Sequence, residues 1–204
     1  MNTHSDCLTC TNPFCARVYN DTYREKICNR AHKIQFKKRN TQVMFFDNGN
    51  VFIIEEGYVL IQRSISSDRP RGTQILGPGD IIGIVQLYNH DYQATLDLLP
   101  LTPVRGCMVP TGAMEGILQT DLTIANAFIE LCTKRIASNS ESLAINSFGT
   151  SRDRLAFYVD RIRKMGLTSE VTQEDLAILA GLNRVTVTKI LNSQSWEERS
   201  KLDR

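Results

Sequence analysis

The chain has 204 residues, 42% of them hydrophobic and 23% charged, a composition typical of a globular protein with one large domain or two small ones. Its 24 basic and 22 acidic side chains leave a net charge of +2, so charge alone does not indicate a nucleic-acid-binding protein. The sequence has no run of 18 apolar residues and residues 1–6 are polar, so we expect a cytoplasmic protein with neither a membrane span nor a signal peptide.

Four of the six cysteines, Cys7, Cys10, Cys15 and Cys28, fall near the start of the chain. Because structural disulfides are rare in a reducing cytosol, this clustering indicates metal binding or redox chemistry. The first three follow the spacing C-x2-C-x4-C, so their thiolates could hold one side of a zinc ion or an iron–sulfur cluster. A thiol–disulfide switch that uses Cys28, and cysteines without any ligand, stay open as alternatives. Without a metal, we expect this polar segment to lack the apolar content needed for order.

Residues 34–110 are expected to form β structure. Turn residues separate three short apolar or alternating runs, 51–54, 58–61 and 74–76. Short strands at this spacing predict a barrel or a sandwich. An enzyme of the cupin type would need a His/Glu metal set on these strands, but only His90 is present, so we expect no enzyme.

A long helix is expected from Thr120 to Asn146, a stretch without glycine or proline. At roughly 1.5 Å per residue it would extend about 40 Å, more than a small barrel can cover. We therefore predict a homodimer through 113–146, with packing on the chain's own barrel as the alternative. Residues at alternating steps of three and four form the predicted coiled-coil seam, in which Asn139 could fix the register: Leu122, Ala125, Ile129, Cys132, Ile136, Asn139 and Leu143.

A second helix is expected over 151–164, followed by a helix-turn-helix. Thr172 and Asp175 have the spacing of a capping box at the start of its first helix. Gly181 supplies the positive φ of the tight turn, and Asn183 can cap a second helix that we expect to end at Asn192. An ordinary helical hairpin without a DNA-binding role is the alternative.

The helix-turn-helix spacing also places Ala177 at the helix crossing and Val187 and Ile190 in the shared core. The second helix would enter the major groove of DNA, where arginine and lysine reach guanine or phosphate, threonine binds a base or a phosphate, and valine touches a thymine methyl. The candidate DNA-binding residues are Asn183, Arg184, Val185, Thr186, Thr188 and Lys189.

Four segments carry a resemblance to a known family: 77–83 (GPGDIIG), 128–131 (FIEL), 154–156 (RLA) and 176–191. Together with the order of roll, long helix and helix-turn-helix, they are similar to the CRP/FNR family of bacterial transcription regulators. The resemblance implies a homodimer that binds a near-palindromic operator in DNA, with RNA polymerase as a further partner.

The resemblance also implies an α+β fold in four parts. A Cys-rich segment, 1–30, precedes a cyclic-nucleotide-binding-like jelly roll, the β-roll, over 31–112. The dimerisation helix follows over 113–146, and the helix-turn-helix domain covers 147–204. The family's β-hairpin wing has no evident counterpart, because 195–204 is polar throughout.

Cyclic AMP is not an expected ligand. Members of the family that bind cyclic nucleotides carry a Gly-Glu-Leu stretch for the ribose and a downstream arginine for the phosphate. The corresponding segments here are 82–85 (IGIV) and 92–96 (YQATL), which contain no arginine. A buried phosphate without a cationic partner would cost several kcal/mol.

The cysteines resemble those of the oxygen-sensing FNR proteins, which have a near-identical N-terminal triplet and a fourth cysteine at the end of the roll. The resemblance implies that Cys7, Cys10, Cys15 and Cys107 ligate a [4Fe–4S] cluster, although the second gap of the triplet is one residue shorter than in the best-known members. The expected function is a regulator that responds to oxygen or redox state. The alternatives are zinc on the same thiolates, a thiol–disulfide switch, or a small ligand in the roll. Cys28 and Cys132 are not expected to be ligands.

Overall fold

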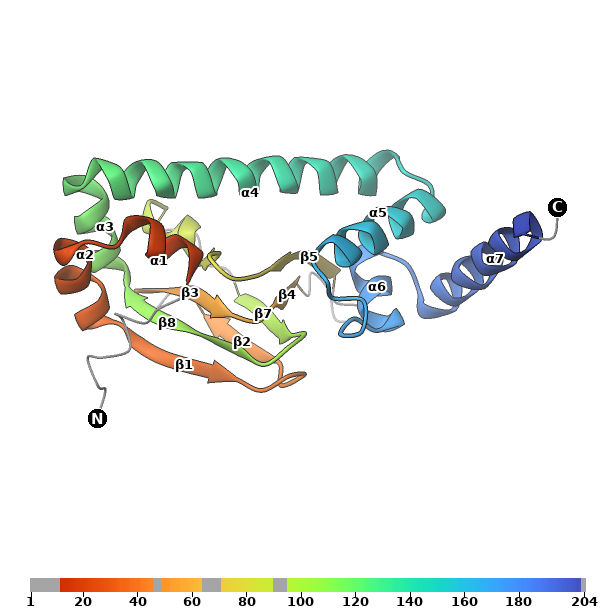
Figure 1. Ribbon diagram of the computed structural model, residues 1–204, viewed down its shortest axis with the longest axis horizontal. Coiled ribbons are helices and arrows are strands. Elements are labelled where there is room, and N and C mark those ends of the chain that lie inside the picture. The colour runs from red at the N-terminus through yellow and green to blue at the C-terminus, as the bar shows by residue number, and fades with distance from the viewer. Residues whose placement is uncertain (1–11, 46–48, 64–70, 90–94, 203–204) are drawn as a thin grey trace. The chain divides into compact units, whose positions relative to one another are not determined.

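The structure is a computed structural model that describes residues 12–45, 49–63, 71–89 and 95–202 (Figure 1). The chain divides into two compact units, one made of 1–62 and 75–137 and the other of 63–74 and 138–204. The division falls within one helix, α4 (Leu122–Phe148). Among the helices in the described ranges, none is long and apolar enough to cross a lipid bilayer.

Two four-stranded sheets form the β-roll, as predicted from the sequence. The first has the order β1 (His32–Phe36), β8 (Val104–Pro110), β3 (Asn50–Glu56) and β6 (Ile81–Ile82). The second has the order β2 (Gln42–Phe45), β7 (Thr95–Pro100), β4 (Val59–Arg63) and β5 (Arg71–Leu76). Strand β8 pairs antiparallel with β1 and with β3, so β3 and β8 lie in the middle of their sheet.

Strand β3 is buried on both faces. Side chains alternate along a strand, so Val51 and Ile53 point to one side and Phe52 and Ile54 to the other. The first pair packs in a cluster with the helices, and the second pair packs in a cluster with residues of β4, β7 and β8. All four are at most 2% exposed. The roll therefore has one core between its sheets and another beneath a layer of helices.

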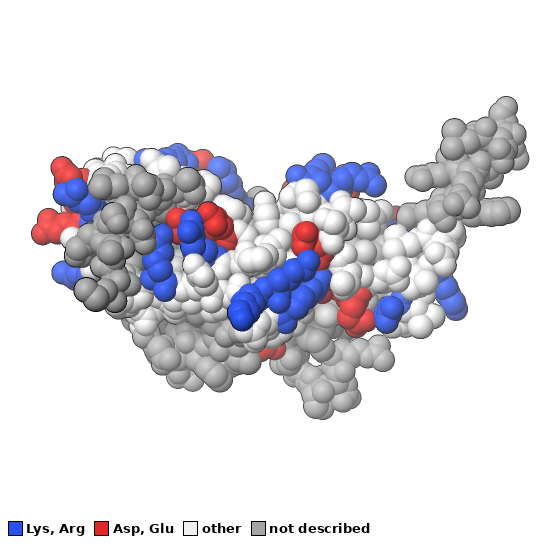
Figure 2. All heavy atoms as spheres, turned by 60° about the horizontal axis from the view of Figure 1, so that its bottom comes forward, with Lys and Arg blue, Asp and Glu red and all other residues white. Residues whose placement is uncertain are grey.

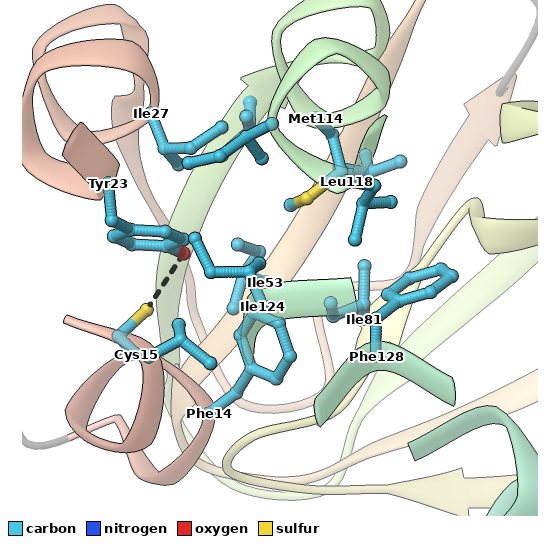
Figure 3. Packing of buried hydrophobic residues seen from close by; sticks show 14 of the residues in the cluster. Phe14, Cys15, Tyr23, Ile27, Ile53, Ile81, Met114, Leu118, Ile124 and Phe128 are labelled. Atoms are coloured by element: carbon cyan, nitrogen blue, oxygen red, sulfur yellow. Dashed lines mark hydrogen bonds between the residues drawn. The ribbon is translucent and has the colours of Figure 1, made fainter. Parts of the chain in front are cut away.

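The helical layer includes the N-terminal segment. It consists of α1 (Pro13–Val18), α2 (Asp21–Lys26), the 3-10 turn η2 (Cys28–Arg30), α3 (Thr111–Thr120) and the start of α4. Figure 3 shows Phe14, Cys15, Tyr23 and Ile27 packed with side chains of the sheet and of α3 and α4. From residue 12 onward, the segment whose polar composition predicted little order forms two short helices with buried side chains. Burial of these few side chains against the roll orders two short helices.

The long helix differs from the prediction at its start. Instead of one helix from Thr120, the structure has α3 ending at that residue and α4 beginning at Leu122. The Asp121 carboxylate accepts hydrogen bonds from the backbone N–H groups of Thr123 (3.0 Å) and Ile124 (3.1 Å). This is a helix N-cap, which separates the two helices.

Three further helices form most of the second unit: α5 (Ser151–Lys164), α6 (Gln173–Ala180) and α7 (Arg184–Leu202). The bounds of α5 agree with the predicted ones. Helix α7 continues beyond the predicted end at Asn192, because no glycine or proline interrupts it. The described residues beyond Asn192 are thus helical and contain no β-hairpin wing.

Gly106 gives a test of the packing around β3. A Cβ atom at this position of β8 would lie 2.3 Å from the carbonyl oxygen of Ile53 and 2.6 Å from the ring of Phe52. We predict that Gly106→Ala lowers the free energy of unfolding by about 1–3 kcal/mol, measured by urea denaturation, because a strand backbone must shift. The control is Gly116→Ala in α3, where nothing lies within 4 Å of the added atom. That change should stabilise the protein by about 0.5–1 kcal/mol. Equal stability of the two variants would contradict the packing described.

Candidate functional site

The helix-turn-helix is held by local hydrogen bonds that the sequence predicted. The Thr172 hydroxyl accepts from the Asp175 backbone N–H at 3.2 Å, and the Asp175 carboxylate accepts from the Thr172 N–H at 2.7 Å. Gly181 ends α6 at φ 62°, and the Asn183 side chain accepts from the Thr186 N–H at 2.7 Å. These contacts fix where α6 ends and α7 begins.

The contact between α6 and α7 uses the predicted small and branched residues. Ala177 and Val187 are fully or almost fully buried, which agrees with their predicted places at the helix crossing and in the core. Ile190 is only partly buried, so it lies at the edge of this core. The opposite side of α7 is consequently left facing solvent.

The candidate DNA-binding residues divide into two groups. Asn183, Arg184, Val185 and Lys189 are exposed, with Val185 63% exposed although it is apolar. Thr186 and Thr188 are half-buried. The Thr188 hydroxyl lies 2.6 Å from Oε1 of Gln173 and 3.0 Å from the carbonyl oxygen of Arg184.

Gln173 was not predicted as part of this surface. It is the first residue of α6, it is exposed, and its side chain reaches Thr188 on α7. Its place at a helix N-terminus, where backbone N–H groups can bind phosphate, is the sequence signal that could have identified it.

Charged side chains form several small groups on the face shown in Figure 2. Groups of Lys and Arg are separated by uncharged residues, and Asp and Glu lie beside some of them. This agrees with the small net charge of +2. Binding of a polyanion would therefore depend on a few well-placed cations such as Arg184 and Lys189.

The structure describes two of the four predicted cluster ligands. Cys7 and Cys10 lie outside the described residues. Cys15 lies in α1 and is buried in the helical core, where its Sγ is 3.4 Å from the Tyr23 hydroxyl (Figure 3). Cys107 lies inside β8, the last strand of the roll, directly opposite Lys33 of β1 and Ile53 of β3.

Tyr23 brings three cysteines into one neighbourhood. Burial raises the pKa of its phenol well above the usual range, and the nearby thiols of Cys15, Cys28 and Cys107 raise it further. Cys28 was not predicted to be a ligand, but it acts on the same tyrosine as the two described candidates. Within the described ranges, no three His, Cys, Asp or Glu side chains are arranged to hold a metal ion.

The predicted seam of α4 is largely uncovered in the single chain. Leu122, Ile129, Ile136 and Leu143 are 60–80% exposed. Asn139 is also exposed, whereas Ala125 and Cys132 are half-buried beside the helical core of the roll. Ile124 and Phe128, on the other side of the helix, are buried against the roll.

Helix α1 is attached to α4 by an ion pair that the sequence did not reveal. The Arg17 guanidinium donates to the Glu130 carboxylate, and Lys134 lies 3.0 Å from the same carboxylate. These cations lower the pKa of Glu130 from 4.5 to about 2, with the Arg17 hydrogen bond as the largest cause. The Cys15-bearing helix is therefore joined to the helix that carries the seam.

Arg135 of α4 is a second unforeseen contact. Its side chain is only 11% exposed, its Nη1 donates to the carbonyl oxygen of Ile81 at 2.6 Å, and its Nη2 lies 3.9 Å from Asp80. Burial lowers its pKa, which the Asp80 charge partly offsets. Among the described residues, Nε and Nη2 of Arg135 have no hydrogen-bond partner.

The segment 82–85 directly follows the two residues that contact this arginine, Asp80 and Ile81. Ile82 ends β6, and Gly83, at φ 89°, starts the 3-10 turn η3 (Ile84–Leu87). Ile82 lies buried between the two sheets, and Ile84 packs against the helical core. The second predicted segment, 92–96, lies mostly outside the described residues.

Known proteins similar to this chain are transcription regulators, although no family model matches it. The cyclic AMP receptor protein of Thermus thermophilus is 22% identical over 170 residues, which cover 72% of this chain and 68% of the relative. The solved structure of the c-di-GMP-responsive global regulator CLP of Xanthomonas campestris has a TM-score of 0.73 and 18% identity, covering 88% of this chain and 93% of that one. A structure from Eubacterium rectale, described as a transcriptional regulator of the Crp/Fnr family, has a TM-score of 0.68 and 16% identity, with 90% and 87% covered. These structures share the fold of the chain.

The pair between Arg17 and Glu130 should give a pH-dependent part of the stability. Because the pKa of Glu130 in the folded protein, about 2, lies below its usual 4.5, its stabilising effect is complete above pH 4.5 and is lost as the pH falls toward 2. We predict that Glu130→Gln and Arg17→Met each lose less stability than the wild type between about pH 6 and about pH 3, measured by urea denaturation. An equally large loss in both variants and in the wild type would rule out this ion pair.

Proposed function

Since its relatives and structural neighbours are transcription regulators of the CRP/FNR family, we propose that this chain is a regulator of that type which binds DNA through α7. The observation that carries the proposal is the exposed side of α7. Two cations and one apolar side chain, Arg184, Lys189 and Val185, remain uncovered there after α6 has covered Val187. This set suits the hydrogen-bond acceptors and the methyl groups of a major groove.

The proposal includes a homodimer. Four large apolar side chains spaced seven residues apart on α4 are exposed in the single chain, namely Leu122, Ile129, Ile136 and Leu143. Their burial against the same residues of a second copy would remove apolar area from water. Two copies would present two recognition helices to a near-palindromic operator. From the family resemblance alone, RNA polymerase is a further proposed partner.

For the signal, we propose a [4Fe–4S] cluster held by Cys7, Cys10, Cys15 and Cys107, which would supply reactivity toward oxygen. The donor set fits such a group, because four cysteine thiolates are its usual ligands and the two described candidates, Cys15 and Cys107, pack in the same apolar cluster. In the described structure, Cys15 is engaged with the Tyr23 hydroxyl, so the thiol must leave it to become a ligand.

Attachments of α1 support a link between this site and the dimer helix. The Asn12 side chain accepts from the Phe14 and Cys15 N–H groups, both at 2.9 Å, and donates to the carbonyl oxygen of Ile54. Arg17 holds the other end of α1 to Glu130. A change in the position of Cys15 would therefore act on β3 and on α4.

A small ligand in the roll is the second candidate signal. It is favoured by Arg135, a buried guanidinium with two nitrogens that have no hydrogen-bond partner among the described residues. Buried donors of this kind usually have a hydrogen-bond acceptor, and an anionic or carbonyl-bearing ligand would supply one. Iron content separates the two candidates, since a ligand-responsive regulator needs none.

The first prediction concerns DNA recognition. If Arg184 pairs with guanine, Arg184→Ala should weaken binding to the preferred duplex by about 1–3 kcal/mol and relax selectivity at one position. If Lys189 contacts phosphate, Lys189→Ala should weaken all duplexes alike and reduce the salt slope by about 1. Duplexes selected from a random pool would be titrated by fluorescence anisotropy at several salt concentrations.

A matched control is Lys164→Ala, which removes a cation of α5 that is paired with Asp160 at 2.7 Å. It should leave affinity and salt slope unchanged. Unchanged affinity and selectivity in Arg184→Ala would remove this residue from the DNA interface.

The second prediction concerns the dimer. Replacing Ile129 and Ile136 with Glu places four charges in the interface of two copies, and burial of unpaired charge is strongly unfavourable. This double variant should be monomeric by analytical ultracentrifugation. The control carries Glu at Asn126 and Thr133, which have the same spacing on α4 and are exposed beside the seam. The control should stay dimeric, and a dimeric Ile129→Glu, Ile136→Glu protein would refute the seam.

The third prediction concerns the metal. After anaerobic reconstitution, the wild type should contain about four iron and four acid-labile sulfide per subunit. Single Cys→Ala changes at the four proposed ligands should each lower this content, whereas Cys28→Ala and Cys132→Ala should retain it. Stoichiometric zinc, or full iron content in Cys107→Ala, would disprove the proposed cluster.

A further inference from the structure

Two half-buried cysteines lie on elements that contact each other where the N-terminal helices join the roll. Cys28 begins η2, which follows α2, and Cys107 lies in the middle of β8. The turn η2 lies against β8, with Cα atoms of the two elements within 8 Å of each other. Both cysteines pack against the same apolar cluster, and both interact electrostatically with the Tyr23 phenol. The fold thus brings together the two elements that carry these cysteines, which are far apart in the sequence.

The other described cysteines are placed differently. Cys15 is buried within α1 and is hydrogen-bonded to Tyr23, which limits access by an oxidant. Cys132 lies on α4, near the charge of Arg135. Cys28 and Cys107 are both partly exposed and lie on elements in contact, so an oxidant can reach both thiols and the two thiols lie in one region of the fold.

We propose that Cys28 and Cys107 form a redox-active dithiol that closes to an intramolecular disulfide. The oxidant is a small disulfide such as oxidised glutathione. One protein thiolate attacks it to give a mixed disulfide and one small thiol. The second protein thiolate then attacks the mixed disulfide, which forms the Cys28–Cys107 bond and releases the second small thiol. Two protein thiols are oxidised, and one small disulfide is reduced to two thiols.

The bridge would join η2 to the central strand β8. The bridge would also occupy the Cys107 sulfur, which the proposed cluster needs as a ligand. If that cluster exists, oxidation to the disulfide would therefore prevent its assembly. Cluster binding and disulfide formation would then be mutually exclusive, because both use the sulfur of Cys107. The disulfide itself does not depend on the cluster and can be tested in metal-free protein.

The experiment treats the full metal-free chain with oxidised glutathione, blocks the remaining thiols with iodoacetamide and maps the peptides by mass spectrometry. Cleavage after Lys, Arg and Glu places Cys28 on 27–30, Cys107 on 106–115 and Cys132 on 131–134, so each cysteine is identified separately. The expected result is a linked pair of 27–30 and 106–115, about 2 Da lighter than the two thiol peptides, that separates on reduction.

Variants make the result specific. Cys28→Ser should lose the linked pair and leave glutathione on Cys107, whereas Cys132→Ser should form the pair as the wild type does. The proposal is overturned if Cys28 and Cys107 retain glutathione without pairing, or if either is instead linked to the peptide 1–17.

Reconstitution of the bridged protein without added thiol gives a separate readout. Loss of iron uptake is expected, and full uptake by bridged protein would refute Cys107 as a cluster ligand while leaving the dithiol intact.

Discussion

Burial of β3 on both faces is the constraint on which the first unit depends. A strand with Val51 and Ile53 on one side and Phe52 and Ile54 on the other needs two covers. The second sheet supplies one of them. The other cover consists of helices from two separate stretches of the sequence, and these include both the cysteine-bearing α1 and the start of α4.

Because those helices share one core, the elements proposed for sensing and for dimerisation are in physical contact. Phe14 of α1 and Phe128 of α4 belong to the same cluster, and Arg17 and Glu130 connect the two helices at the surface. Well-packed cores respond to a displaced side chain by shifting between discrete arrangements rather than by bending gradually. A displacement of Cys15 would therefore act on the seam-bearing helix α4 through side chains that are in direct contact.

The sequence was informative where structure is determined locally. The capping box of α6, the positive φ of Gly181 and the bounds of α5 follow from side chains within a few residues of the backbone groups they satisfy. Helices α1 and α2 were missed because six residues are too few to show a period, and their order comes from burial of Tyr23 and Phe14 against distant strands. For the same reason, the contact between η2, which carries Cys28, and β8, which carries Cys107, could not be predicted, since it depends on how distant segments pack.

The spacing of the exposed residues on α4 has a geometric consequence. Leu122, Ile129, Ile136 and Leu143 repeat every seven residues, but seven residues fall about 20° short of two full turns of an α-helix. The apolar stripe therefore winds slowly around the helix instead of running parallel to its axis. Two such helices can keep their stripes in contact only by coiling around each other with a left hand. A change in the pitch of this supercoil near the roll would therefore rotate the far end of α4 about the supercoil axis.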